Sequence, residues 1–327
     1  MTNPMNPMDP THPIDPIDPT HPTHPIDPTD PTNPTDPTDQ PIVVGVDGSR
    51  ASLRAVDWAA DEAALRGAAL RLVHASVWER YEGGLLAPDP DEPSERELIE
   101  DMVAVAERRA RHRQPGVRVT TAVLPEEPEY TLVRESRTAL AVVLGSRGRG
   151  ATAEAMEGSV TAAVAGHAHC PVIVIPGGQD PPAHPRGWGR IVLGVGERPA
   201  GSAAVRFAVE EASVRGVPLD AVRAWRHPAP VTAARGPHAL AAPAPAEQQA
   251  AELLEDALRD APADMKVDRR ALEGHPRDVL TAVSRQADLL VVGARRHHGH
   301  FGPRLGRIAH GALHHAACPV AVVPELS

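Results

Sequence analysis

The chain has 327 residues, 42% hydrophobic and 23% charged, which is long enough for two domains that each bury a core. Its formal charge is −10, but the first 40 residues hold seven aspartates and no Lys or Arg, so the remainder carries −3. A nearly neutral folded part argues against nucleic acid as a partner. The apolar runs are far shorter than the roughly 20 residues of a membrane helix, and no basic-then-apolar signal pattern opens the chain. We therefore expect a cytoplasmic protein without membrane contact.

Residues 1–40 have proline at every third position from Pro4 to Pro37. A period of three matches the polyproline II helix, which has no internal hydrogen bonds. The segment has too few apolar side chains to build a core, so we expect a disordered, extended arm. A partner-binding role for this arm is the alternative.

From residue 41 onward, apolar runs of strand length alternate with segments of helical periodicity. Strands are expected at 41–46, 68–77, 116–124, 139–146 and 171–176, and helices over 51–66, 94–113, from 129 and from 158. This alternation predicts an α/β fold with a parallel sheet and crossover helices.

The second half of the chain repeats the first. Three residues of the first copy recur 148 residues later, namely Gly145 as Gly293, Gly158 as Gly306 and Cys170 as Cys318. This is a tandem duplication, with domains at 41–176 and 190–325 and a Pro/Gly-rich linker at 177–189. Each cysteine precedes an apolar run and is interpreted as a small buried hydrophobe rather than as half of a disulfide.

A glycine pattern follows the fourth strand of the first copy: Gly145-x-x-Gly148, nine further residues, then Gly158-Ser159. Such glycines allow the backbone to come close to a ligand, and a helix that opens at Gly158 offers unpaired N–H groups to an anion. Arg147 would add positive charge. In a doubly wound sheet, ligands bind where the strand order reverses, and the first and fourth strands border that point. The alternative is a glycine loop that binds nothing.

Other nucleotide motifs are missing. The turn after the first strand, GVDGSRAS, is not G-x-G-x-x-G, and the chain has no G-x-x-x-x-G-K-[ST]. The sequence therefore argues against a dinucleotide-dependent dehydrogenase and against a P-loop ATPase.

The strand ending VGVDGS, the LVHA strand, the glycine pattern and the closing CPVIVIP together resemble the universal stress protein family, in tandem over about residues 41–325. The resemblance implies ATP as the ligand, with magnesium left open, and a Rossmann-like α/β fold for each copy, with five parallel strands in the order 3-2-1-4-5 and helices on both faces. It also implies that Asp47 and Ala75 contact the adenosine end. The remaining residues implied by the resemblance line the loop or hold ribose and phosphates: Leu144, Gly145, Arg147, Gly148, Gly158, Ser159, Val160 and Thr161.

The second copy departs from the pattern. Gly196 stands where the first copy has Asp47, Arg296 replaces Gly148, and Arg307 replaces Ser159. An arginine where backbone must approach a phosphate would obstruct it, so we expect no ATP there. The basic residues of this loop leave another anion as an alternative. The nearby histidines at 297, 298, 300, 310, 314 and 315 suggest zinc, but the neighbouring arginines would repel a cation, so no metal site is expected.

Both copies end in an apolar run after Cys-Pro that would lie at a sheet edge without a protecting Lys. We expect residues 172–175 to pair antiparallel with residues 320–323 inside one chain, as the resemblance to dimers of the family also implies. A homodimer of the whole chain is left open. The function implied is that of an ATP-binding regulatory module of the stress response. The alternatives are a scaffold that binds no nucleotide and a slow ATP-hydrolysing enzyme, for which no catalytic residues are apparent.

Overall fold

The computed structural model describes residues 40–77, 94–146, 159–177, 189–197, 199, 201–227, 246–295, 297–299 and 302–325. Nearly all of the proline-rich arm and most of the linker lie outside these residues. Arg147, Gly148 and Gly158 of the glycine pattern also lie outside them.

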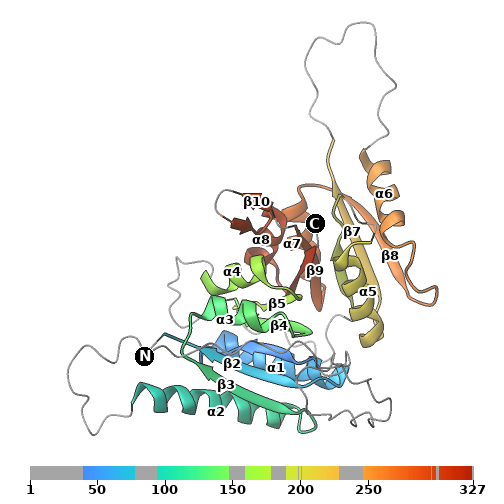
Figure 1. The fold of residues 1–327 in the computed structure, drawn as a ribbon. Coiled ribbons are helices and arrows are strands. Elements are labelled where there is room, and N and C mark those ends of the chain that lie inside the picture. The colour runs from blue at the N-terminus through green and yellow to red at the C-terminus, as the bar shows by residue number, and fades with distance from the viewer. Residues whose placement is uncertain are drawn as a thin grey trace, which may run out of the picture. The chain divides into compact units, whose positions relative to one another are not determined.

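The first half contains five strands and four helices within the described residues (Figure 1). The strands are β1 (Ile42–Gly45), β2 (Leu70–Ala75), β3 (Val119–Leu124), β4 (Ala141–Gly145) and β5 (Val172–Ile175). The helices are α1 (Arg50–Arg66), α2 (Glu95–Arg113), α3 (Pro128–Glu135) and α4 (Ser159–His167).

The second half repeats this order and adds a short hairpin. Its strands are β6 (Ile191–Gly194), β7 (Leu219–Trp225), β8 (Val267–Glu273), β9 (Leu289–Arg295), the hairpin strands β10 (His297–Gly299) and β11 (Gly302–Arg304), and β12 (Val320–Glu325). Its helices are α5 (Ala203–Arg215), α6 (Ala246–Ala257), α7 (Pro276–Ser284) and α8 (Arg307–His315).

The two halves share one sheet of ten strands, ordered β3-β2-β1-β4-β5-β12-β9-β6-β7-β8. Within each half all neighbouring strands are parallel, as expected for chains that cross over through helices. The predicted order 3-2-1-4-5 is confirmed for the first half. The second half has the same strand order when it is read from the opposite edge of the sheet.

Two hydrophobic cores lie on opposite faces of the sheet because successive strand residues point to opposite sides. Ile42 and Val44 pack in the core that also holds buried alanines of α1 and α5. Val43 packs in the other core, with Leu132 of α3 and Val164 of α4. Helices therefore cover both faces, as predicted. In Figure 1, α2 runs beside β3 at the outer end of the first half of the sheet.

The helix ends follow local sequence signals. Ser94 and Glu97 form a reciprocal capping box at the start of α2, in which each side chain accepts a backbone N–H of the other residue. Gly67 and Gly216 end α1 and α5 with φ values of 65° and 64°, a left-handed conformation that favours glycine. These two glycines are 149 residues apart, so the duplicated helices end in register.

The predicted pairing between the two halves is confirmed. β5 and β12 are antiparallel, with Val174 opposite Val320, Ile173 opposite Ala321 and Val172 opposite Val322. The backbone groups that would be unpaired at the edge of each half are therefore paired with the other half.

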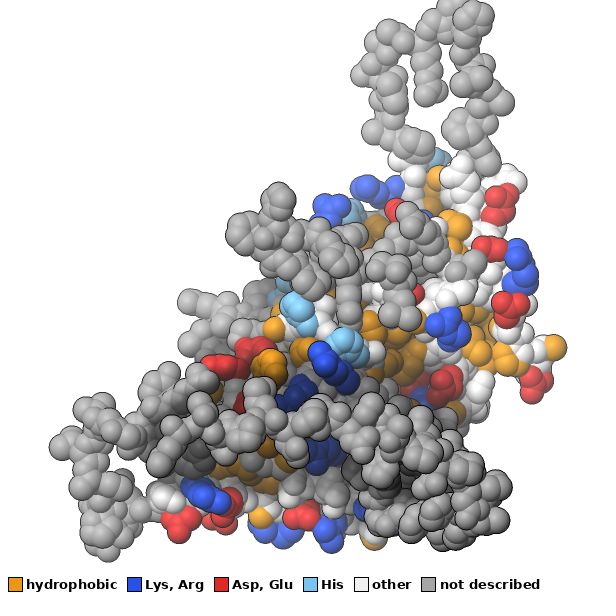
Figure 2. Space-filling view, in the orientation of Figure 1, with side chains coloured by type: hydrophobic (Ala, Val, Ile, Leu, Met, Phe, Trp, Pro, Cys, Tyr) orange, Lys and Arg blue, Asp and Glu red, His pale blue; other side chains and the backbone are white. Residues whose placement is uncertain are grey.

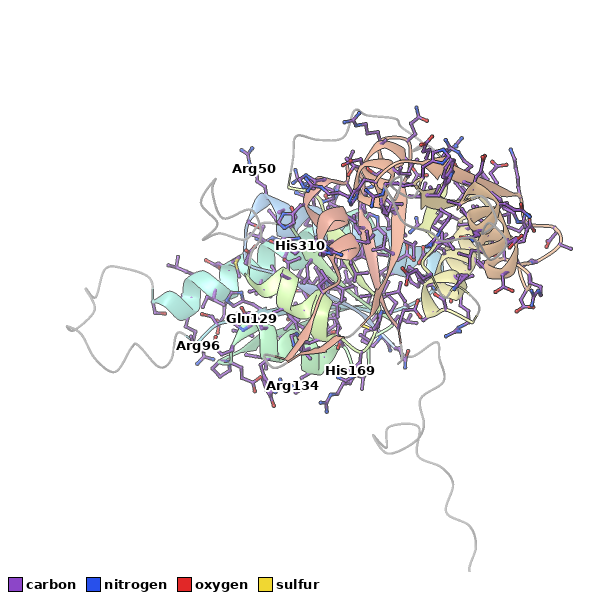
Figure 3. All side chains as sticks on the ribbon, turned by 90° about the horizontal axis from the view of Figure 1, so that it is seen from above. Arg50, Arg96, Glu129, Arg134, His169 and His310 are labelled. Carbon is purple, nitrogen blue, oxygen red and sulfur yellow. The ribbon has the colours of Figure 1, made fainter. Side chains whose placement is uncertain are left out.

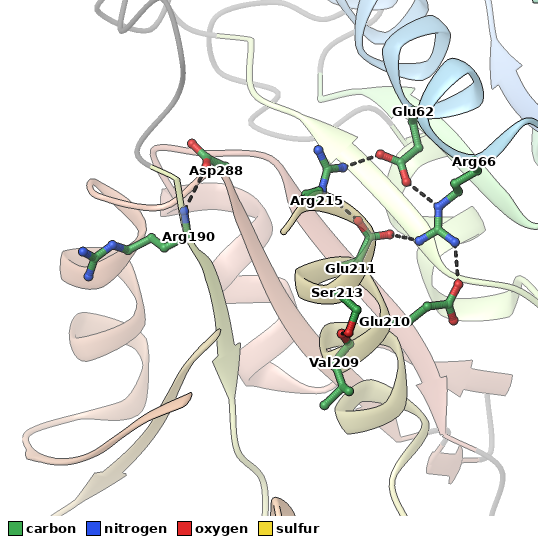
Figure 4. Close-up of polar contacts among 9 residues, drawn as sticks. All are labelled: Glu62, Arg66, Arg190, Val209, Glu210, Glu211, Ser213, Arg215 and Asp288. Carbon is green, nitrogen blue, oxygen red and sulfur yellow. Dashed lines mark hydrogen bonds and ion pairs between the residues drawn. The ribbon is translucent and has the colours of Figure 1, made fainter. Parts of the chain in front are cut away.

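A cluster of charged residues joins α1 to α5 beside this seam (Figure 4). Arg66 forms ion pairs with Glu62 of its own helix and with Glu211 of α5, and Arg215 pairs with the same two carboxylates. Glu62 and Glu211 are 3% and 2% exposed. The two Glu-x-x-x-Arg pairs are 149 residues apart, so the contact is reciprocal, like an isologous interface between identical subunits.

Candidate functional site

The candidate site lies at the carboxyl ends of β1 and β4. β1 pairs with β2 on one side and with β4 on the other, so the strand order reverses at β1. α1 follows β1 on one face of the sheet, and α4 follows β4 on the other. The helices diverge there, which is the place where doubly wound sheets bind their ligands.

Asp47 lies in the turn between β1 and α1. Its Oδ1 atom accepts a hydrogen bond of 3.0 Å from the backbone N–H of Ser49. Gly48 has a φ of 76°, and the Ser49 hydroxyl oxygen accepts the Ser52 N–H at 3.1 Å, which caps α1. The carboxylate of Asp47 is thus held in place by a short, capped turn at the point where the strand order reverses.

His74, at the end of β2, fixes the preceding strand. Its Nδ1 lies 2.7 Å from the carbonyl oxygen of Val46, which indicates that Nδ1 carries the proton and donates it. Ala75 comes next and ends β2, half-buried. This hydrogen bond of His74 links the end of β2 to the residue that follows β1.

The close packing of α1 against β4 requires glycine at position 145. A Cβ atom at this position would lie 2.6 Å from the carbonyl carbon of Ala51, 2.7 Å from the Ala51 Cβ and 2.9 Å from the Ser52 nitrogen. Only glycine lets the first turn of α1 come this close to β4. The sequence assigned Gly145 to the approach of a ligand, and the structure shows that the approach of a helix already requires it.

A hydrogen bond joins β4 to the start of α4. The Thr161 hydroxyl, 5% exposed, donates to the Gly145 carbonyl at 3.1 Å. Leu144 is buried, and Val160 packs against the same core from the first turn of α4. The structure therefore joins the carboxyl end of β4 to the first turn of α4. Ser159 begins α4, but its side chain is outside the described set.

We expect Gly145→Ala to lower the free energy of unfolding by about 1–3 kcal/mol, the usual cost of overpacking, because the atoms it would meet belong to backbone. Denaturant unfolding would measure this. Gly196→Ala is the matched control, since a Cβ there meets nothing within 4 Å and should change stability by no more than about 0.5 kcal/mol. Equal midpoints for both variants would contradict the packing role.

The second domain lacks this arrangement because its first helix begins later. α1 has 17 residues and α5 has 13, although both end at equivalent glycines. About one turn of helix is therefore missing from the start of α5, at the place where α1 covers Gly145.

The side chain of Glu325, from the end of β12, fills the vacated space. Its carboxylate accepts the Ala203 N–H at 3.0 Å, the Ala204 N–H at 3.1 Å and the Ser202 hydroxyl. Its Oε1 lies 2.9 Å from where a Cβ on Gly293 would be. A carboxylate of the chain itself thus occupies the positive end of α5.

The loop of the second domain that corresponds to the glycine pattern contains a hairpin. β10 and β11 pair antiparallel, with His297 opposite Arg304 and Gly299 opposite Gly302. The sequence patterns predicted neither this hairpin nor the role of Glu325 as a cap of α5. The feature of the sequence that distinguishes Glu325 is its acidic side chain just after the last apolar strand, where the first copy has Gly177.

Figure 2 shows acidic and basic side chains interspersed over the face that it presents. Among the described residues, no group of three or more His, Cys, Asp or Glu is arranged to hold a metal ion. No helix in the described part of the chain is long and apolar enough to cross a membrane.

Comparison with known proteins identifies the family. The sequence profile of the universal stress protein family matches residues 40–176 and residues 187–324. The universal stress protein Rv1996 of Mycobacterium tuberculosis is 33% identical over 300 residues, which cover 86% of this chain and 94% of the relative.

Solved structures share the fold. A universal stress protein from Archaeoglobus fulgidus aligns with a TM-score of 0.59 at 14% identity and covers 87% of this chain and 98% of that one. A second universal stress protein from the same organism, solved in complex with dAMP, is 27% identical, with a TM-score of 0.31, and covers 42% of this chain and 98% of that one.

Proposed function

The chain belongs to the universal stress protein family, and on this premise we propose that its first domain binds ATP, that its second domain does not, and that it acts as a nucleotide-dependent regulatory module in stress responses. The observation that carries the proposal is the contrast between the two domains. The first keeps the glycine pattern. The second has lost it, and Glu325 occupies the start of α5, the helix that corresponds to α1.

The geometry of the first domain supports a phosphate site next to Gly145. The Thr161 hydroxyl is used by the Gly145 carbonyl, so the start of α4 is anchored to β4. The N–H groups at the start of a helix have no partner within the helix and carry its positive end, which suits the phosphates of ATP. Asp47 follows β1 and Ala75 ends the neighbouring strand β2, where the adenosine end would lie.

Two other functions remain as alternatives. A scaffold without nucleotide would be indicated by protein that releases no ATP on denaturation. An ATP-hydrolysing enzyme would be indicated by steady-state turnover. Neither the sequence nor the described residues present an acid–base pair beside a nucleophile, so the regulatory role is preferred.

Calorimetric titration with ATP, with and without magnesium chloride, should give close to one site per chain, because only one copy has the complete pattern.

Gly148→Arg, which places the residue of the second copy into the first, should weaken ATP binding at least tenfold, about 1.4 kcal/mol. Arg296→Ala is the matched control and should leave binding unchanged. Two equivalent ATP sites per chain, or unaltered ATP affinity in a folded Gly148→Arg protein, would contradict the proposal.

A further inference from the structure

α8 carries two histidines four residues apart, one of which, His310, is labelled in Figure 3. Ala309, Gly311 and Ala312 are the buried residues of this helix, whereas His310 is exposed and His314 half-buried. The Nε2 atoms of the two histidines are 3.2 Å apart, and their ring centroids are 4.3 Å apart at an interplanar angle of 55°. Both rings thus turn the same nitrogen toward one point.

The separation of the two nitrogens matches that of a chelating pair. Zinc–imidazole bonds are about 2.0–2.1 Å long, so two nitrogens at a tetrahedral angle lie about 3.3–3.4 Å apart, and at a right angle about 2.9 Å apart. The observed 3.2 Å falls between these values. Without an ion, one Nε2–H donates to the other Nε2. An ion would take the place of that proton, which would move to Nδ1 of the donating ring, so that both rings carry their proton on Nδ1.

The charges along α8 are arranged more favourably than the sequence alone indicates. Arg307 lies in the first turn, seven residues and about 10.5 Å along the axis from His314. His314 lies in the last turn, where the carbonyl end of the helix favours positive charge. Repulsion by Arg307 is therefore weaker at His314 than at His310, which lies three residues from it.

The ligand type determines which ions fit. Imidazole nitrogen suits zinc, nickel and copper, whereas calcium and magnesium prefer oxygen ligands. The buried thiols would not compete, because burial raises the pKa values of Cys170 and Cys318 to about 12 and keeps them protonated. With two protein ligands in the described part of the chain, water would complete the coordination.

We propose that His310 and His314 form a chelating site for a divalent transition-metal ion of this class. The site lies in the second domain, and it is separate from the nucleotide site proposed for the first. It gives the domain without an ATP motif a ligand of its own.

Calorimetric titration of the nucleotide-free full chain with zinc chloride tests this site. His310→Gln and His314→Gln should each weaken one zinc site at least tenfold, and glutamine keeps the helix propensity, so the folded state should persist in circular dichroism. His315→Gln is the matched control, because its ring lies 5.9 Å from that of His314 and is not part of the pair.

The proposal is overturned if the wild-type chain binds no zinc, if both pair variants bind it as the wild type does, or if His315→Gln loses as much affinity as they do. Zinc binding by other histidines is common to all four proteins and cancels in the comparison. ATP titration of His310→Gln should equal that of the wild type, which keeps this test independent of the nucleotide proposal.

Discussion

Proline in place of Val322 should destabilise both domains together. Val322 lies in β12, which is bonded to β5 of the first half on one side and to β9 of its own half on the other. Proline has no N–H to donate and is tolerated in sheets only at edges or bulges. In a central strand it leaves a buried partner carbonyl unpaired, which by itself costs about 1–3 kcal/mol, and the ring adds steric conflict.

Hydrogen exchange resolved by peptide would measure this effect. Peptides covering β4 of the first domain and β9 of the second should lose protection in parallel, because the strand that is disturbed connects the two halves. Thr121→Pro is the control, since Thr121 is exposed in β3, at the far end of the sheet, and pairs only with β2. It should weaken protection in the first domain alone. Loss of protection confined to the second domain in Val322→Pro would show that the halves fold independently.

The pairing of β5 with β12 could be predicted from the sequence because both strands are uniformly apolar and have no feature that protects an edge. The parallel sheet could be predicted from the alternation of apolar runs and helical segments, whereas its strand order was implied by the family resemblance. Both predictions depend on patterns within about ten neighbouring residues.

Such local patterns cannot predict contacts between residues that are far apart in the sequence. Glu325 caps α5 from 122 residues further along the chain, and no local rule relates the two. The packing requirement at Gly145 was missed in the same way, because the helix turn that causes it is 94 residues earlier in the sequence. A signal did exist for the charge cluster, since the motif Glu-x-x-x-Arg-Gly occurs in both copies at Glu62 and Glu211.

The second large effect on stability is expected at the charge cluster between α1 and α5. Glu211→Ala should lower the free energy of unfolding by about 3–5 kcal/mol, the usual cost of removing one member of a buried ion pair, because Arg66 and Arg215 would each lose a buried partner. Burial and the neighbouring charge of Glu62 raise the pKa of Glu211, which indicates how strongly the site depends on the two arginines to hold charge there. A cavity of about 190 Å³ borders the cluster, so water can enter and should place the cost near the lower end of the range.

Glu210→Ala is the control that makes this prediction sharp. Glu210 is adjacent in sequence and also pairs with Arg66, but its side chain is 57% exposed. An exposed ion pair contributes about 0–1 kcal/mol, so this variant should unfold almost as the wild type does. Guanidinium unfolding of the two variants and the wild type would give the comparison. If Glu210→Ala costs as much as Glu211→Ala, burial is not what gives the cluster its strength, and α1 and α5 are joined chiefly by other contacts.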